Sequence, residues 1–150
     1  MKPYLTPEAV AYAALLASSF HRQTGQLLPE DPEQLWHHPH PLVSHGAQAD
    51  PVFCYANSAA LVLWEMDWHS FTQLPSRFSA EPDLDIQSDR ATLLKTALAK
   101  GHVANYQGIR ISAKGNRIAI SQTLLWSVID TYGQARGQAA LIGKITPLIG

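Results

Sequence analysis

The stretch that decides the fold is residues 108–140, which read GIRISAKGNRIAISQTLLWSVIDTYGQARGQAA. Apolar and polar residues alternate on both sides of Lys114-Gly115, as in two antiparallel strands joined by a tight turn. A two-residue turn fixes the register of such a pair and aligns four isoleucines across it. The aligned pairs are Ile111 with Ile118 and Ile109 with Ile120. The sequence therefore predicts that these isoleucines share one face of a sheet.

A second turn and a third strand follow in the same stretch. In an uninterrupted strand, every second residue points to the same face, so Leu124, Trp126 and Val128 should share the face of Ile118 and Ile120. Residues 130–133, Asp-Thr-Tyr-Gly, have the composition of a turn. The chain then returns through residues 137–140, which are rich in small side chains. We expect three antiparallel strands that form a sheet with two different faces.

An amphipathic helix is predicted near the N-terminus. Thr6 can cap it, Pro7 suits its first turn, and Gly25 suits a left-handed C-cap, so the helix should run to about Thr24. Its apolar stripe consists of Val10, Ala13, Ala14, Ala17 and Phe20. This stripe must be covered, either by the sheet of the same chain or by the same helix of a second chain.

The middle of the chain is predicted to hold short elements. Four prolines between Leu28 and Pro41 disfavour helices and central strands, so we expect an ordered linker pinned by Trp36. Asn57 and Asp67 are typical helix N-caps. The expected elements are strands over 41–47 and 51–55, helices over 58–64 and 68–72, an irregular segment over 74–82, and a longer helix over 85–100.

The composition of the chain limits the kinds of protein that it can be. With 150 residues, 46% hydrophobic and 15% charged, the chain can form one compact domain. A net charge of −1 without a basic run disfavours nucleic acid as a partner, and no apolar run is long enough to span a bilayer. The lone Cys54 excludes an intrachain disulfide, and residues 1–4 do not resemble a signal peptide. We expect a cytoplasmic protein without a membrane partner.

Several segments of the chain resemble the MEKHLA family, a PAS-like family. They are Val43-Ser44-His45-Gly46, residues 49–57 (ADPVFCYAN), Ala59-Ala60-Leu61, residues 74–82 (LPSRFSAEP), Gly108 to Ser112, and Gly137 to Ala140. The resemblance implies an α+β fold, in which a PAS-like five-stranded antiparallel sheet and its flanking helices enclose a small cavity. It assigns residues 41–146 to the PAS-like domain. Residues 1–40 then form an extension with the N-terminal helix and a Pro/His-rich linker.

The resemblance also gives candidate ligand-binding residues. Aromatic rings on predicted strands and helices would surround the cavity, as either core or cavity wall, and polar side chains of the irregular segment and third strand could line it. Arg77, Ser79 and Glu81 are equally suited to fixing a loop. The candidates are Phe53, Tyr55, Trp64, Phe71, Arg77, Ser79, Tyr106, Arg110, Ser112 and Trp126.

No metal is predicted, and whether the domain holds a cofactor stays open. His37, His38, His40 and His45 are close in sequence, but a proline-rich linker does not provide the fixed, closed ligand set of a structural metal site. In the photosensory PAS proteins the reactive cysteine follows the second strand, whereas Cys54 lies within it, so no flavin adduct is expected. Haem-binding members use a histidine on the long helix, and residues 85–100 contain none.

Three functions remain open at this stage. The first is a sensor domain that binds a small molecule in its cavity and signals through protein contacts. The second is a ligand-free interaction module, with a homodimer or an unidentified protein as partner. The third is a cone-fold enzyme of the isomerase type with Glu81 or Asp50 as base, but no catalytic motif is visible, so we expect no enzyme activity.

Overall fold

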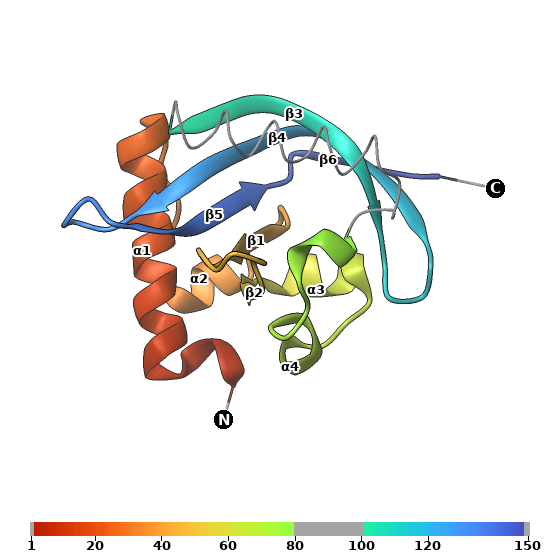
Figure 1. The fold of residues 1–150 in the computed structure, drawn as a ribbon, viewed down its shortest axis with the longest axis horizontal. Coiled ribbons are helices and arrows are strands. Elements are labelled where there is room, and N and C mark those ends of the chain that lie inside the picture. The colour runs from red at the N-terminus through yellow and green to blue at the C-terminus, as the bar shows by residue number, and fades with distance from the viewer. Residues whose placement is uncertain (1, 80–100, 149–150) are drawn as a thin grey trace.

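The computed structural model describes residues 2–79 and 101–148. In these residues four helices and two short strands precede the sheet's long strands (Figure 1). The helices are α1 (Pro7–Thr24), α2 (Pro32–Trp36), α3 (Ser58–Trp64) and α4 (Trp68–Phe71), with 3-10 turns η1 (Pro3–Leu5) and η2 (Ser76–Ser79). The strands are β1 (Leu42–His45), β2 (Phe53–Ala56), β3 (His102–Ile111), β4 (Arg117–Ile129), β5 (Ala135–Leu141) and β6 (Lys144–Pro147). The helix expected over 85–100 lies outside the described residues.

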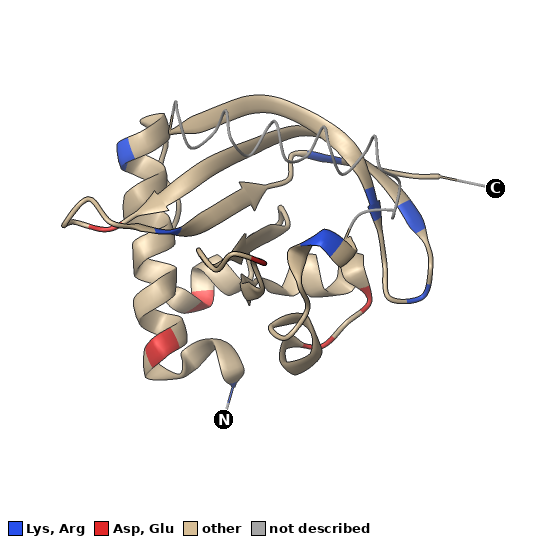
Figure 2. Cartoon of the chain, in the orientation of Figure 1, with Lys and Arg blue, Asp and Glu red and all other residues tan. Residues whose placement is uncertain are grey.

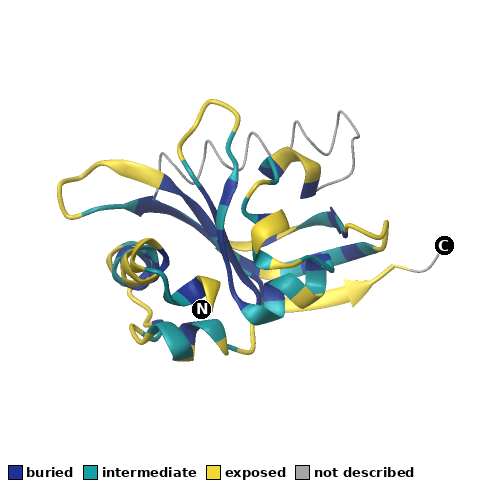
Figure 3. Cartoon of the chain, turned by 90° about the horizontal axis from the view of Figure 1, so that it is seen from below, coloured by how far each residue is buried: buried dark blue, intermediate teal, exposed yellow. Residues whose placement is uncertain are grey.

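The strands form one antiparallel sheet in the order β2-β1-β5-β4-β3. The sequence predicted five strands, and the structure adds β6, which pairs with β4 beyond the end of β5. Strand β6 follows Gly143, and its four residues are all exposed. Figure 3 shows that buried residues follow the middle of the long strands, whereas β6 and the hairpin tips are exposed.

The predicted register of the β3–β4 hairpin is wrong by one residue. Ile111 pairs with Arg117 and Arg110 with Ile118, so Ile109 and Ile111 do not share a face with Ile118. The loop has three residues rather than two, because the Ser112 backbone N–H donates to Asn116 O at 2.9 Å. Gly115, with φ 84°, occupies the left-handed position that ends such a loop. The shift brings Arg110 onto the same face as Ile118 and Ile120.

A bulge in β4 then changes which of its residues point to which face of the sheet. Gln122 has φ 50° and Asn105, in β3, has φ 58°, and the pairing slips between Tyr106 and Gly108. As a result, Trp126 lies on the opposite face from Ile120, contrary to the prediction. We call the face with Tyr106, Ile120 and Leu125 the cavity face, and the face with Trp126, Val128 and Ala139 the α1 face.

Helix α1 has the predicted bounds and covers the α1 face of the sheet (Figure 1). Thr6 accepts the Ala9 N–H, and Gly25 adopts φ 75° as C-cap. The buried stripe is rotated from the predicted one, because Val10 and Ala14 are exposed while Ala9 and Leu16 are buried. The Trp126 indole N–H donates to Ser19 Oγ at 3.1 Å, which fixes the helix on β4.

The linker contains a helix that the proline argument missed. Pro32 occupies the first turn of α2, where its missing N–H costs nothing, and Asp31 caps the turn by accepting from Glu33 N and Gln34 N. Trp36 does pin the segment, because its ring stacks on Tyr4 with the centroids 4.0 Å apart. The linker is thereby held against the N-terminal turn η1.

Helices α3 and α4 begin at their predicted caps and lie against the cavity face. Asn57 accepts from Ala60 N, and Asp67 accepts from Ser70 N. Trp64 of α3 and Phe71 of α4 pack against Phe53 of β2, with the Phe53 and Phe71 rings stacked 4.2 Å apart. These rings form a second core, separate from the core under α1.

Candidate functional site

A small cavity of about 50 Å³ lies between the cavity face of the sheet and the helical side. Its apolar wall comes from β1, β2, β4 and β5, and polar groups from β1, β3, β5 and η2 reach into it. The described lining residues are Val43, Ser44, His45, Phe53, Trp64, Ser79, Tyr106, Arg110, Ile120, Leu125, Gln138, Ala139, Ala140 and Ile142. The combination of apolar walls with a few buried polar groups is typical of ligand pockets.

Among the described lining residues, Arg110 is the one that carries a permanent charge, and it is only 7% exposed. Its Nη2 donates to Tyr106 Oη at 2.8 Å, and its Nη1 donates to its neighbour's carbonyl, Ile109 O, at 2.9 Å. Gly108 makes room for this pair, since a Cβ there would lie 2.9 Å from Tyr106 Oη and 3.0 Å from Arg110 Nη1. Among the described residues, no carboxylate forms an ion pair with Arg110.

Two further polar atoms in the lining have no hydrogen-bond partner within the described part of the chain. They are Gln138 Oε1 and Trp64 Nε1, both buried. The amide nitrogen of the Gln138 side chain does have a partner, because Nε2 donates to Ser127 Oγ on β4 at 3.4 Å. A buried amide oxygen or indole N–H without a partner costs free energy, so both atoms are suited to a bound molecule.

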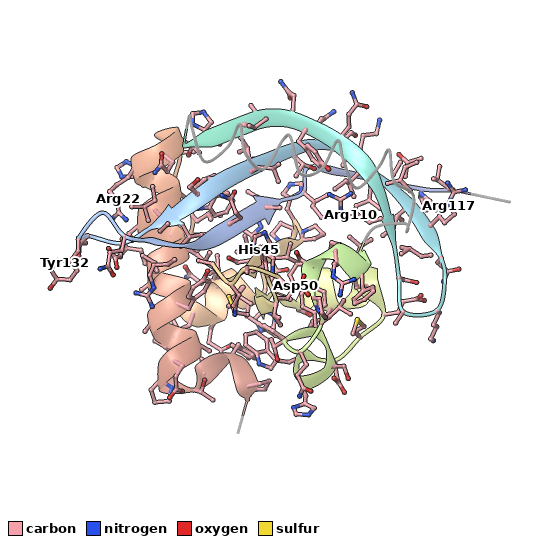
Figure 4. The ribbon with its side chains drawn as sticks, in the orientation of Figure 1. Arg22, His45, Asp50, Arg110, Arg117 and Tyr132 are labelled. Atoms are coloured by element: carbon pink, nitrogen blue, oxygen red, sulfur yellow. The ribbon has the colours of Figure 1, made fainter. Side chains whose placement is uncertain are left out.

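His45 and Ser79 complete the polar part of the lining. His45 Nδ1 lies 2.9 Å from Gly46 O, at the end of β1 where the pairing with β2 is irregular. Ser79 Oγ donates to Ser76 O at 2.7 Å within η2. Figure 4 shows His45 and Arg110 toward the middle of the molecule, below the curved sheet, whereas Arg117 and Tyr132 lie at opposite ends.

The structure brings five of the ten predicted residues together around this cavity. They are Phe53, Trp64, Ser79, Tyr106 and Arg110. Trp126 and Tyr55 instead belong to the core under α1. Phe71 stacks on Phe53, and Ser112 closes the β3–β4 loop by accepting from the backbone N–H groups of Lys114 and Asn116, while it donates to Glu65 at the end of α3. Their contacts are those of core and loop-fixing residues.

Arg77 lies apart from the cavity, on the exposed side of η2. Its Nε donates to Asp50 Oδ1 at 3.1 Å, and its guanidinium stacks 4.2 Å above the Phe78 ring. Both side chains of the ion pair are about half exposed, at 53% and 55%. The two residues that the sequence offered as ligand and base therefore fix the β1–β2 loop against η2.

Sequence reasoning missed Gln138 and His45 as lining residues. Gln138 was noticed only as part of a strand with small side chains, and the signal that could have found it is a large polar residue among Gly137, Ala139 and Ala140. His45 was considered as one of four histidines that are close in sequence. The burial of both follows from the central position of β1 and β5 in the sheet.

Cys54 lies outside the cavity, on the side of α1. Its Sγ is 3.6 Å from Ser44 O, and burial raises the pKa of the thiol. It lines a different depression, together with Tyr12 and Trp68. The thiol therefore does not contribute to the cavity under the sheet.

The remaining charges and histidines do not form a second site in the described ranges. Acidic and basic residues are spread over separate elements (Figure 2). Within residues 2–79 and 101–148, no group of three or more His, Cys, Asp or Glu side chains could hold a metal ion. In the same ranges no helix is both long and apolar enough to cross a bilayer.

The comparison with protein families adds to this geometry. The model of the MEKHLA domain matches residues 10–146. The chain belongs to the MEKHLA domain family. The matched span begins within α1 and contains the linker, the sheet and all described lining residues of the cavity.

Curated proteins with a similar MEKHLA region come from rice. The chain is 28% identical over 132 residues to homeobox-leucine zipper protein HOX10 of Oryza sativa, in both the indica and japonica subspecies. The match takes in 82% of this chain but only 15% of the length of HOX10. The relative is therefore a much longer protein, of which this domain resembles one part.

Solved structures with the same fold include PAS and light-oxygen-voltage domains. The light-state dimer of the fungal blue-light photoreceptor Vivid has a TM-score of 0.65 at 15% identity, with 96% of this chain and 100% of that chain covered. The PAS domain of a protein from Colwellia psychrerythraea has a TM-score of 0.60 at 13% identity, covering 71% and 86%. The helices between β2 and β3 thus belong to a PAS-like fold, as predicted.

A flavin, which the light-oxygen-voltage neighbours suggest, does not fit the cavity of this MEKHLA domain. Cofactor-sized ligands occupy pockets of about 300–1,000 Å³. The cavity of about 50 Å³ is far smaller, and Cys54 does not line it. Any ligand of this site must be a much smaller molecule.

Proposed function

We propose that this MEKHLA domain is a sensor domain that binds a small molecule in the cavity between the sheet and the helices. The observation that carries the proposal is the set of buried polar groups around the cavity, Arg110, Gln138 and Trp64, whose binding capacity is incompletely used by the described residues. A domain gains nothing in stability from such groups unless a partner satisfies them. A bound molecule supplies that partner.

Binding at this site has a physical connection to α1. The Ser44 hydroxyl donates to the backbone oxygen of Gln138 at 2.7 Å, and it lies 2.8 Å from Tyr12 Oη on α1. Since the Ser44 proton is used for Gln138, the Tyr12 hydroxyl is the donor in the second bond. A ligand that holds Gln138 acts on the strand to which α1 is tied. A ligand shifts the balance between two conformations of a protein only if it contacts them differently, and a ligand bound to Gln138 could do so through this strand and α1.

The second candidate function is a ligand-free interaction module, and the small volume of the cavity favours it. At about 50 Å³ the space is close to what side chains leave unfilled. The domain would then act through its surfaces, in a homodimer or with another protein. The longer HOX10 relative, which carries a similar region within a larger chain, is compatible with either candidate.

Native mass spectrometry separates the two candidates. The protein is purified from its own host, its mass is measured folded and then denatured, and any released molecule is identified. The sensor proposal expects a stoichiometric small molecule that is lost from a variant with a filled cavity, Ala140→Leu, but retained by Ala135→Leu, which adds the same volume at an exposed position. No bound molecule, together with no thermal shift across a metabolite panel, would leave the interaction module.

A further inference from the structure

We propose that the molecule bound in this cavity is a small carboxylate that also carries a hydrogen-bond donor, as a 2-hydroxy acid does, with Arg110 holding the carboxylate. The inference rests on the proposed function and goes beyond it by naming the chemical class. Three features carry it: a buried guanidinium without a counter-charge among the described residues, an acceptor and a donor in the same lining that have no partner in that part of the chain, and a small volume.

The charge of Arg110 requires an anion. A guanidinium stays protonated in proteins, and a buried cation is costly unless it is paired. The described contacts use two of its five N–H groups, one to Ile109 O and one to Tyr106 Oη, and both acceptors are neutral. The remaining N–H groups form a planar fork that matches a carboxylate in a bidentate pair. The cavity adjoins this side chain.

The partners of Gln138 and Trp64 define the rest of the molecule. Gln138 Oε1 is a buried acceptor without a partner in the described structure, so it calls for a hydroxyl or amino donor on the ligand. Trp64 Nε1 is a buried donor that also has no partner in the described structure, and it can donate a hydrogen bond to an oxygen of the ligand. A simple carboxylate offers the acceptors that Arg110 and Trp64 call for, whereas a hydroxy or amino carboxylate also offers the donor that Gln138 calls for.

The size of the cavity limits the molecule to a few heavy atoms. A water-sized sphere occupies only about 10–15 Å³, so a cavity of about 50 Å³ suits a ligand of a few heavy atoms, such as glycolate, rather than a cofactor. Val43, Ile120 and Leu125 close the cavity with apolar surface. A longer polar chain on the ligand would have to be buried against these walls without hydrogen bonds, which disfavours it.

The test is a calorimetric titration of the folded protein with three probes: glycolate, acetate and glycolamide. Glycolamide keeps the size and the hydroxyl of glycolate but has no charge. We expect glycolate to bind most tightly, acetate less tightly, and glycolamide at least about tenfold more weakly than glycolate, because charge-assisted hydrogen bonds are the stronger ones. Arg110→Met should weaken glycolate by about tenfold or more, and Arg110→Lys, which keeps the charge, should weaken it less.

The control is Arg136→Ala, which removes an exposed arginine that pairs with Asp130 on the β4–β5 turn. It should leave glycolate binding unchanged. Circular dichroism establishes that each variant is folded, and Arg110→Lys keeps the test valid if Arg110→Met does not fold. Equal binding of glycolamide and glycolate, or an Arg110→Met domain that binds glycolate as the wild type does, would overturn the carboxylate while leaving the sensor proposal.

The remaining outcomes are also decisive. If no probe binds and the molecule released in the native mass spectrum has no carboxylate, the carboxylate assignment is wrong and the sensor proposal stands. If no probe binds and nothing is released, both fail.

Discussion

Replacing Asn57 with alanine tests how this domain joins its linker, first strand and third helix. The side chain is completely buried and makes bonds to all three. Its Oδ1 accepts from Leu42 N at 3.0 Å and from Ala60 N at 3.1 Å, and its Nδ2 donates to His40 O at 3.0 Å. Asn57→Ala removes these bonds and leaves the backbone groups without their partner.

The cost can be worked out from these contacts. Loss of the N-cap bond to Ala60 costs about 1 kcal/mol. The Leu42 N–H and the His40 carbonyl each lose their partner, at about 1 kcal/mol or more each. The free energy of unfolding should therefore fall by about 3 kcal/mol or more. For a domain of this size, that corresponds to a decrease of roughly 6–12 °C in melting temperature.

Thermal unfolding followed by circular dichroism measures the effect. The matched control is Asp67→Ala, which removes an N-cap of the same kind from α4, where the side chain is exposed and bonds only the Ser70 N–H in the described structure. Its melting temperature should fall by a clearly smaller amount. Equal losses in the two variants would refute the reasoning, because they would mean that the bonds to Leu42 and His40 contribute nothing beyond capping.

Two further predictions concern titrating groups. Hydrogen bonds from Ser112 and Asn116 lower the pKa of Glu65, so its contribution to stability is present above the ordinary glutamate range and is lost as the pH falls through the lowered pKa. Melting temperatures between pH 2 and pH 6 should thus fall less steeply for Glu65→Gln than for the wild type, and a parallel pH profile would contradict this. Burial raises the pKa of the Cys54 thiol, so iodoacetamide at pH 8 should alkylate the native protein at least about tenfold more slowly than the denatured chain, and equal rates would show an accessible thiolate.

Helix boundaries were predictable because local hydrogen bonds determine them. Thr6, Asn57 and Asp67 each accept from a backbone N–H two or three residues after the helix begins, and such bonds need no tertiary context. The family resemblance gave the antiparallel sheet and its flanking helices. Helix α2 was missed since prolines were weighed as breakers, although Pro32 stands at the position where proline is favoured.

The register of the hairpin was not predictable from alternation alone. Ser112 Oγ accepts from the N–H groups of Lys114 and Asn116, which stabilises a loop one residue longer than the Lys114-Gly115 pair suggests. That residue decides which face of the sheet carries Arg110. The bulge at Gln122 has no marker in the sequence, because a non-glycine residue adopts the positive φ there. Trp126 was therefore assigned to the wrong face, whereas Tyr106 and Arg110 do line the cavity.

Half of the candidate site depended on contacts between distant segments. Arg77 is drawn to Asp50, and Trp126 to Ser19, by packing that no local pattern contains. Gln138 gains its position from two neighbouring strands, β1 and β4. A buried polar residue is identified as a candidate for binding only once its partners have been counted, and that count needs the structure.

The most direct test of the cavity as a ligand site is the ¹H–¹⁵N NMR signal of the Trp64 indole during titration with glycolate. The four tryptophans provide internal references, because the Trp126 indole N–H already donates to Ser19 on the α1 face. The Trp64 indole has no described partner and lines the cavity. We predict a saturable shift of the Trp64 signal with little movement of Trp126. A Trp64 signal that stays unchanged at saturating glycolate, or that moves no more than Trp126, would contradict binding in this cavity.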